Sequence, residues 1–555
     1  MRNNSVIQIA FSFLVIFLIT NLYAQRPNWF DKVNVLANKG TADFPTTGGT
    51  WGFKPLHPEI DDLAWHINYY HDKGTFYHSS MQFQNQWLGA NVDSSIAAID
   101  FYGNPIAAAS GFEANLHHPA WQDSLIKFVK LIIDLGGDGV IIDGYSPNIQ
   151  AIRRAGGSFD DYTMEDFRAY LESKYSADEL ETQFDISDIS IFNYGNWLRE
   201  HGLDPTEVPW SQRMEGLLAE FWLFEWQFSV EIYSQFLRIA KEYAKTKYSK
   251  NFVVSENNAG FYYNSANIDD FLIGEFFYYG PGRKTTDLAA SHVKVGKAIA
   301  DKPVLIFPEI VERVGKISLH QHLENMIKLI LADIYASGGT ALAADWLLHL
   351  RDGSYTTPFD VDKQTLSNYA SFILENSNLL EKLNSISKVG LVYSFASTFN
   401  SQIVIENWND NLTFPIGYTG MSKLLIEANI QHDVIYLPDL RFPSREITAE
   451  QLSKFSCIVM PNIYSMTDEQ AELLLDYVNS GGVIIAAGTT GTHDENGEFA
   501  NRSVLQSLTN NSTNPHGKGF FVHFNDDIGR RYSDSGNPDY KKRNSSALLK
   551  KKLIL

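Results

Sequence analysis

Short apolar runs alternate with longer amphipathic segments from about residue 46 to about residue 385. Apolar runs of four to eight residues between turn signals are typical of buried parallel strands, and apolar positions spaced three or four apart indicate helices. A succession of such strand–helix units predicts an α/β fold, a TIM (β/α)8 barrel. We expect its strands near residues 50–53, 75–83, 96–102, 139–143, 252–255, 271–276, 304–307 and 341–344.

Two further features define this barrel domain, which we expect to span residues 25–387. Pro119 suits the first turn of a helix over 120–135, whose apolar face precedes the fourth strand. A helical insertion of about residues 158–250 then separates the fourth strand from the fifth. Within the insertion we expect helices over 164–175 and 214–247.

The pattern changes near Lys388, where a second domain begins and runs to about residue 525. Strands and helices alternate there again, which predicts a doubly wound, flavodoxin-like α/β domain. Residues 526–555 are polar and basic, and their low hydrophobicity predicts a disordered tail. In the second domain, we expect strands over 389–393, 434–437, 458–461, 483–488 and 520–524, and helices over 420–428 and 468–479.

Composition narrows the class of protein. Hydrophobic residues make up 44% of the 555 residues and charged residues 20%, which is a globular composition. The formal net charge of −20 argues against nucleic acid as a partner, because neutralising phosphates requires a basic footprint. Cys457 is the only cysteine, so no intramolecular disulfide forms.

The first 24 residues predict a signal peptide. Arg2 supplies the positive start, residues 7–20 are nearly all apolar, and the Ala24–Gln25 bond is a plausible cleavage point. The apolar run is shorter than the ~20 residues that a membrane span needs. We therefore expect a bacterial periplasmic or secreted protein that does not associate with the membrane after cleavage.

Acidic residues lie within or just after four consecutive predicted strands of the barrel, at Asp143, Glu256, Glu275 and Glu309. In a βα barrel such positions open into the active-site mouth. Glycoside hydrolysis needs two carboxylates, one to protonate the leaving oxygen and one to act as nucleophile or base. Asp143, Glu275 and Glu309 are therefore the candidate catalytic residues, although each also has a structural interpretation as a cap or a buried ion-pair member.

Aromatic and polar side chains near the same strand ends suit sugar binding, although aromatic rings also fill barrel cores. Basic residues recur on the loops after the strands, at Arg153, Arg154, Arg283, Lys284, Arg313 and Arg351. Ordinary loop ion pairs explain these residues, and so does an anionic sugar, because arginine suits the recognition of carboxylate and sulfate groups. The candidate substrate-binding residues are Trp51, Tyr145, Glu256, Asn257, Arg313, Asp345 and Trp346.

No motif in the chain indicates a cofactor or a metal. His117-His118 lacks a third ligand at zinc spacing. No phosphate-binding glycine pattern lies between a strand and a helix, and no Gly-Xaa-Ser-Xaa-Gly elbow occurs. Cys457 starts an apolar strand, where a cysteine acts as a small hydrophobic residue rather than a nucleophile.

The layout over residues 46–525 resembles the glycoside hydrolase family 42 β-galactosidases. The phrases that carry the resemblance are Gly137–Asp143 in the barrel, Phe167–Leu171 in the insertion and Asn479–Ile485 in the second domain. The resemblance implies a TIM barrel joined to a glutamine-amidotransferase-like domain, which supports a homo-oligomer. No cysteine matches the amidotransferase nucleophile, so we expect this domain to be structural.

The end of the fourth strand departs from that family. In family 42 the acid/base is a Glu that follows an Asn at the end of this strand, whereas this chain has Ile142-Asp143-Gly144 there. Glu309 matches the family's nucleophile position on the seventh strand. An Asp that ends strand four instead resembles the nucleophile of α-glycosidase-type barrels, whose acid/base comes from strand six. The absence of Asn-Glu therefore favours Asp143 paired with Glu275, which leaves Glu309 in substrate binding.

The leading hypothesis is an exported glycoside hydrolase that acts on a carbohydrate substrate, either a polysaccharide or its oligosaccharides. Two alternatives stay open. The first is a non-catalytic carbohydrate-binding protein on a hydrolase-like barrel, which binds sugars without releasing product. The second is a polysaccharide lyase, whose products absorb as unsaturated uronates.

Overall fold

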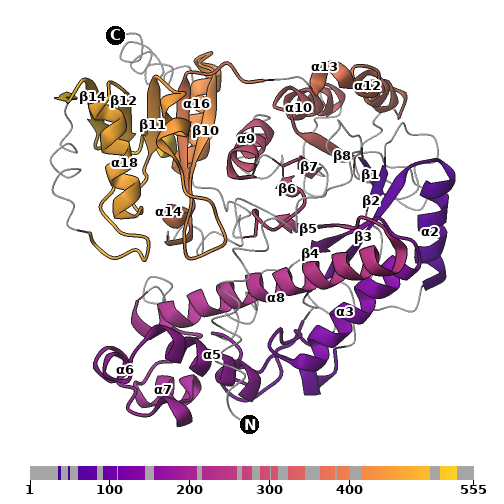
Figure 1. Cartoon of the computed structure of the whole chain (residues 1–555), viewed down its shortest axis with the longest axis vertical. Helices are drawn as coiled ribbons and strands as arrows, with labels where there is room; N and C mark the ends of the chain where they lie inside the picture. The colour runs from indigo at the N-terminus through magenta and orange to yellow at the C-terminus, as the bar shows by residue number, and fades with distance from the viewer. Residues whose placement is uncertain are drawn as a thin grey trace. The chain divides into compact units, whose positions relative to one another are not determined.

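The computed structural model shows an α/β protein with two sheets (Figure 1). Strands β1 to β8 form a closed barrel in chain order, and the remaining six strands form an open sheet. The chain divides into two compact units, one built mainly on residues 47–257 and the other on residues 258–555. The structure describes residues 36–38, 48–50, 60–83, 92–108, 111–143, 156–208, 215–258, 265–277, 288–300, 302–309, 323–343, 363–381, 384–400, 416–500 and 513–533.

The first unit holds four of the barrel strands, which pair in parallel. The register sets His78 opposite Gly139, and Gly139 opposite Val253. A Cβ on Gly139 would meet the imidazole of His78 and the carbonyl oxygen of Val253, both at 2.5 Å, so the strands approach closely at this glycine. The strands are β2 (Gly48–Thr50), β3 (Phe76–Gln82), β4 (Gly139–Asp143) and β5 (Val253–Asn258).

Helices of the first unit include the predicted insertion between β4 and β5. His118 caps α3 by accepting a hydrogen bond from the backbone N–H of Ala120, and Pro119 is the first helical residue, as the sequence predicts. Phe167, Tyr194 and Phe221 are buried in the core of the insertion. The helices are α2 (Ile60–Asp72), α3 (Pro119–Asp134), α5 (Asp161–Lys174), α6 (Ala177–Phe184), α7 (Tyr194–Glu200) and α8 (Gly216–Tyr248).

The prediction of a barrel strand over residues 96–102 is wrong. A short 3-10 helix, Ser94–Ile96, leads instead into isolated antiparallel bridges, which pair Ala97 with Ala114 and Ile99 with Pro105. Asp100 accepts hydrogen bonds from the backbone N–H groups of the residues that follow and turns the chain back. The apolar residues therefore pack within a small ribbon in the β3–α3 connection, where Ala98 is buried.

The second unit holds the other barrel strands and their helices. β1 is a three-residue strand that pairs in parallel with β8, and it was not predicted because so short a run carries no recognisable pattern. The expected strand at 50–53 corresponds to β2, and residues 51–53 lie outside the described part of the chain. The elements are β1 (Leu36–Asn38), β6 (Leu272–Phe277), α9 (Leu288–Ala300), β7 (Val304–Glu309), α10 (Leu323–Ala336), β8 (Thr340–Ala343), α12 (Lys363–Glu375) and α13 (Ser377–Leu380).

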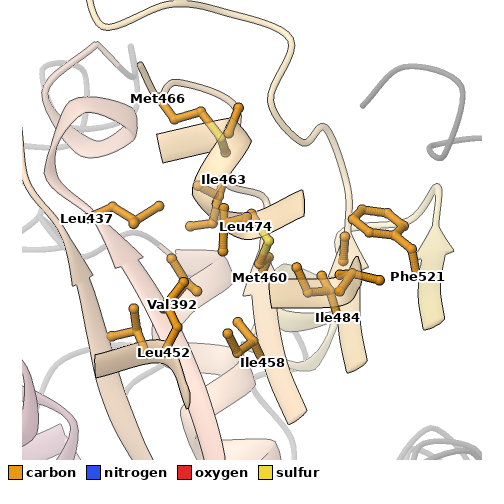
Figure 2. Packing of buried hydrophobic residues seen from close by; sticks show 14 residues of the cluster. Val392, Leu437, Leu452, Ile458, Met460, Ile463, Met466, Leu474, Ile484 and Phe521 are labelled. Atoms are coloured by element: carbon orange, nitrogen blue, oxygen red, sulfur yellow. The ribbon is translucent and has the colours of Figure 1, made fainter. Parts of the chain in front are cut away.

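The open sheet of the second unit has the strand order β10-β9-β11-β12-β14-β13. Its first five strands are parallel and follow the flavodoxin-type order, which confirms the predicted doubly wound fold. Val392, Ile458 and Met460 pack with helix residues on one face of the sheet (Figure 2). The strands are β9 (Val389–Ser394), β10 (His432–Leu437), β11 (Cys457–Pro461), β12 (Val483–Ala487), β13 (Thr513–His516) and β14 (Gly519–Phe524).

One helix lies in the segment that the sequence predicts as a disordered tail. α20 packs on α16 where Gly420 and Gly529 bring the two backbones together, because a Cβ on Gly420 would collide with the carbonyl of Gly529. No helix in the described part of the chain is long and apolar enough to cross a bilayer. The helices are α14 (Phe395–Asn400), α16 (Ile416–Glu427), α17 (Ala449–Ser453), α18 (Asp468–Asn479) and α20 (Ile528–Ser533).

Candidate active site

Asp143 is the last residue of β4 and lies on the interior face of the barrel sheet. Tyr77 of β3 stacks on Tyr70 of α2, with ring centroids 5.4 Å apart, so this face of β3 looks towards the helices. Side chains alternate along a strand, which puts Gln82 on the opposite face. The register pairs Gln82 with Asp143, and paired residues of parallel strands share a face. The position therefore suits a group that acts in the barrel mouth.

Register separates two of the predicted binding residues, Glu256 and Asn257. Glu256 pairs with Ile142, which lies on the helix-facing side of β4, and its side chain is fully buried. Asn257 follows it on the interior face and is partly exposed. The backbone therefore favours Asn257 over Glu256 as a residue that contacts substrate.

Glu275 and Glu309 share one face of β6 and β7 in the second unit. Gly296 of α9 lies against Leu272 and Val304, which are paired in register and so define the helix-facing side. Alternation places Glu275 and Glu309 on the opposite, interior side. Glu309 pairs with Phe277, so Glu275 stands two residues away on the neighbouring strand, and the two Cα atoms are about 8 Å apart by strand geometry.

The other predicted binding residues, Trp51, Tyr145, Arg313, Asp345 and Trp346, lie outside the described residues. The basic loop residues at 153, 154, 283, 284 and 351 also lie outside them.

His78 belongs to the interior face of β3 and was not predicted. It is fully buried, and burial lowers its pKa to about 4, so the imidazole is neutral at neutral pH. Ser80 follows on the same face and is also buried. The available signal was two polar residues inside an otherwise buried strand, because buried polar groups in native structures have hydrogen-bond partners.

His117 is held between two carboxylates. Its Nδ1 atom lies 2.7 Å from Oδ2 of Asp166 on α5, and its Nε2 atom lies 3.3 Å from Oε2 of Glu225 on α8. The ring stacks on Phe228 with centroids 3.7 Å apart. Burial alone would lower the pKa of His117, but Glu225 and Asp166 outweigh it and raise that pKa to about 9. The histidine is therefore a buried cation that joins the β3–α3 connection to the helical insertion.

Further hydrogen bonds attach the same connection to the insertion. The backbone N–H of Phe159 donates to the carbonyl of Ile99 at 2.8 Å. Arg199 of α7 donates from Nη2 to the carbonyl of Phe101 at 2.6 Å and lies over its ring. This connection leaves the carboxyl end of β3. The insertion that is bonded to it therefore lies at the carboxyl end of the first unit's strands.

Comparison with known proteins gives sequence relatives but no family model that matches the chain. An "Alpha-agarase" of Thalassotalea agarivorans is 25% identical over 503 residues, which is 82% of this chain and 32% of that protein. The chain thus spans about a third of the length of the curated relatives it matches.

Solved structures share the fold over about nine tenths of the chain. The family 42 β-galactosidase Gan42B of G. stearothermophilus superposes with a TM-score of 0.63 at 12% identity, over 91% of this chain and 87% of that one. The exo-carrageenase of family 42 from Bacteroides ovatus gives a TM-score of 0.53 at 12% identity, over 92% and 71% of the two chains. The chain therefore has the architecture of the family 42 glycoside hydrolases, a TIM barrel followed by a doubly wound α/β domain.

Proposed function

We propose that this protein is an exported glycoside hydrolase that cleaves a galactose-based polysaccharide or its oligosaccharides. The observation that supports the proposal is the backbone position of three acids: Asp143 and Glu309 end β4 and β7, and Glu275 lies two residues before the end of β6. The sequence relative named as an α-agarase and the fold neighbour named as an exo-carrageenase support this substrate class.

In the mechanism we propose, Asp143 and Glu275 are the two working carboxyl groups. The protonated group donates to the glycosidic oxygen as the bond to the anomeric carbon breaks. The ionised group either attacks that carbon or removes a proton from the water that attacks it. Water supplies the new hydroxyl, and the acid recovers its proton, so the reaction is a hydrolysis that needs no further reactant. Glu309 binds substrate in this pairing and is the nucleophile in the alternative.

A glycan panel tests the proposal. Purified protein is incubated with agarose oligosaccharides, carrageenan oligosaccharides and simple β-galactosides, and the products are analysed by mass and NMR. We expect reducing-end products without unsaturated uronates. Saturable binding without product would favour the non-catalytic alternative. Cleavage of neutral agarose oligosaccharides together with sulfated ones would show that the loop arginines do not select an anionic sugar.

The leaving group distinguishes the two pairings. Loss of a general acid costs about 10²–10⁴-fold on natural glycosides, and most of this loss disappears on aryl glycosides whose leaving group needs no proton. We expect the turnover of Glu275→Gln to recover on aryl glycosides. The ratio of turnover on aryl glycosides to turnover on natural glycosides should be the same in Glu309→Gln as in the wild type. A Glu309→Gln variant that loses turnover on both substrates would assign the nucleophile to Glu309.

A further inference from the structure

α9 connects the two strands that carry Glu275 and Glu309, and it also contacts the open sheet's layer. In the second unit it packs on β6 and β7 with one side and on β10 and α16 with another (Figure 1). Gly296 permits a close approach to the strands, because a Cβ there would lie 2.7 Å from Val304. A displacement of α9 therefore displaces both strands, since close-packed protein interiors transmit strain.

A network of polar groups links α9 to α16 and β10. The hydroxyl oxygens of Ser291 on α9 and Ser422 on α16 are 2.7 Å apart, and the Ser422 hydroxyl lies 3.1 Å from Nε2 of His432. The hydroxyl of Tyr418 donates to the carbonyl of Ser291 at 3.1 Å. Lys294 donates from Nζ to the carbonyl of His432 at 2.8 Å.

Three members of this polar network are buried, so water cannot replace their hydrogen bonds. Ser291, Ser422 and His432 are at most 2% exposed. Burial lowers the pKa of His432 to about 3, so its imidazole is neutral at neutral pH. A buried polar network that loses one partner is worse than an apolar contact, so the network favours one position of α9.

The network lies at the functional end of the barrel. Ser291 is in the first turn of α9, and a helix that follows a barrel strand runs back antiparallel to it. The first turn therefore stands beside the carboxyl ends of β6 and β7, where Glu275 and Glu309 lie. A separate link at the other end joins Nδ2 of Asn267, five residues before β6, to the carbonyl of Pro443 at 2.7 Å.

We propose that Ser422 and His432 of the open-sheet domain are positioning residues, which hold α9 through Ser291 and thereby fix the relative placement of Glu275 and Glu309. This inference rests on the proposed glycosidase function for its catalytic consequence. It gives the second domain a role in turnover through the position of α9.

The test compares Ser422→Ala with the matched control Asn267→Ala in the full-length protein. Each variant removes one side-chain hydrogen bond between barrel and second domain, but only the first acts through α9. Ser422→Ala also removes the contact between Ser422 and His432, which lies within the second domain. We expect Ser422→Ala to lower kcat about tenfold with KM nearly unchanged, because small misplacements of reacting groups cost that much or more. Asn267→Ala should keep the wild-type kcat even if its Tm falls.

Hydrogen–deuterium exchange provides a readout that does not need turnover. Ser422→Ala should speed exchange in α9, β6 and β7 more than Asn267→Ala does. Equal exchange in the two variants would overturn the inference, whether or not a glycan is cleaved. A wild-type protein that releases no product, combined with the expected exchange difference, would overturn the proposed function and keep the mechanical coupling. A kcat loss of equal size in both variants would also contradict the specific role of Ser422.

Discussion

Asp143→Asn is expected to lower kcat by about 10³-fold or more, within the range for removing a group that transfers a proton or attacks in the transition state. Asparagine has the same shape as aspartate but does not ionise, so the loss is chemical. Because Asp143 ends its strand on the interior face, the change leaves the register of β4 intact. The melting temperature, followed by circular dichroism, should therefore stay close to that of the wild type.

Asp138→Asn is the matched control, because Asp138 immediately precedes β4 at its other end. Its Oδ2 lies 2.8 Å from Nε2 of His71 and accepts the backbone N–H of Tyr77 at 2.8 Å, while its Oδ1 lies 2.7 Å from Nζ of Lys250. Burial opposes ionisation of Asp138, but Lys250 and these hydrogen bonds hold its pKa below the usual range. We expect this variant to melt earlier yet keep its kcat. Wild-type turnover in Asp143→Asn would reject the role assigned to Asp143.

Much of the fold could be predicted because its strands are long enough to carry a pattern. β4 and β12 are apolar runs that follow helices of clear periodicity, and both lie where expected. β1 has three residues and was missed, since no pattern can be read in so short a run. The segment at 96–102 has the composition of a strand, but Asp100 accepts a backbone hydrogen bond that reverses the chain. The segment therefore forms isolated antiparallel bridges instead of a barrel strand.

The sequence predicts which acids lie near strand ends, but it does not predict the face of the sheet on which each one lies. Acids at strand ends are visible in the sequence, whereas the face of each depends on register with a neighbouring strand. Glu256 and Asn257 are adjacent, and only the pairing of Glu256 with Ile142 shows which of them faces the interior. His117 was recognised only as a poor metal ligand, because its partners lie 49 and 108 residues further along the chain.

The His117 cluster should dominate the stability of the first unit. Removing one member of a buried ion pair costs about 3–5 kcal/mol, since the remaining charge is left in a low-dielectric site. His117→Ala leaves Glu225, which is 1% exposed, without its cation. We expect a loss of this size in the free energy of unfolding, measured by urea denaturation. His201→Ala removes an exposed pairing with Asp185 at 3.8 Å and should cost about 1 kcal/mol or less.

A double variant separates the ion pair from simple packing loss. His117 also stacks on Phe224 and Phe228, so part of the cost of His117→Ala is the cavity left beside these rings. His117→Ala combined with Glu225→Ala removes the stranded carboxylate as well. If charge dominates, the double variant is less destabilised than the sum of the two single changes. Additive losses would show instead that the cluster stabilises by packing alone.

The pH dependence of stability follows from the same pair. The pKa of His117 rises from 6.5 in the unfolded chain to about 9 in the folded protein. Below pH 6.5 both states bind the proton and the full contribution is present, about 3 kcal/mol for a shift of this size. As pH rises through 9 the folded protein releases the proton and the contribution is lost. The charged groups around the ring are Asp166 on α5 and Glu225 on α8. Burial raises the pKa of the nearby Glu231 on α8, and the charge of Asp166 raises it further. The stability difference between wild type and His117→Ala should therefore shrink between pH 6.5 and pH 9, and a difference independent of pH over this interval would contradict a buried imidazolium.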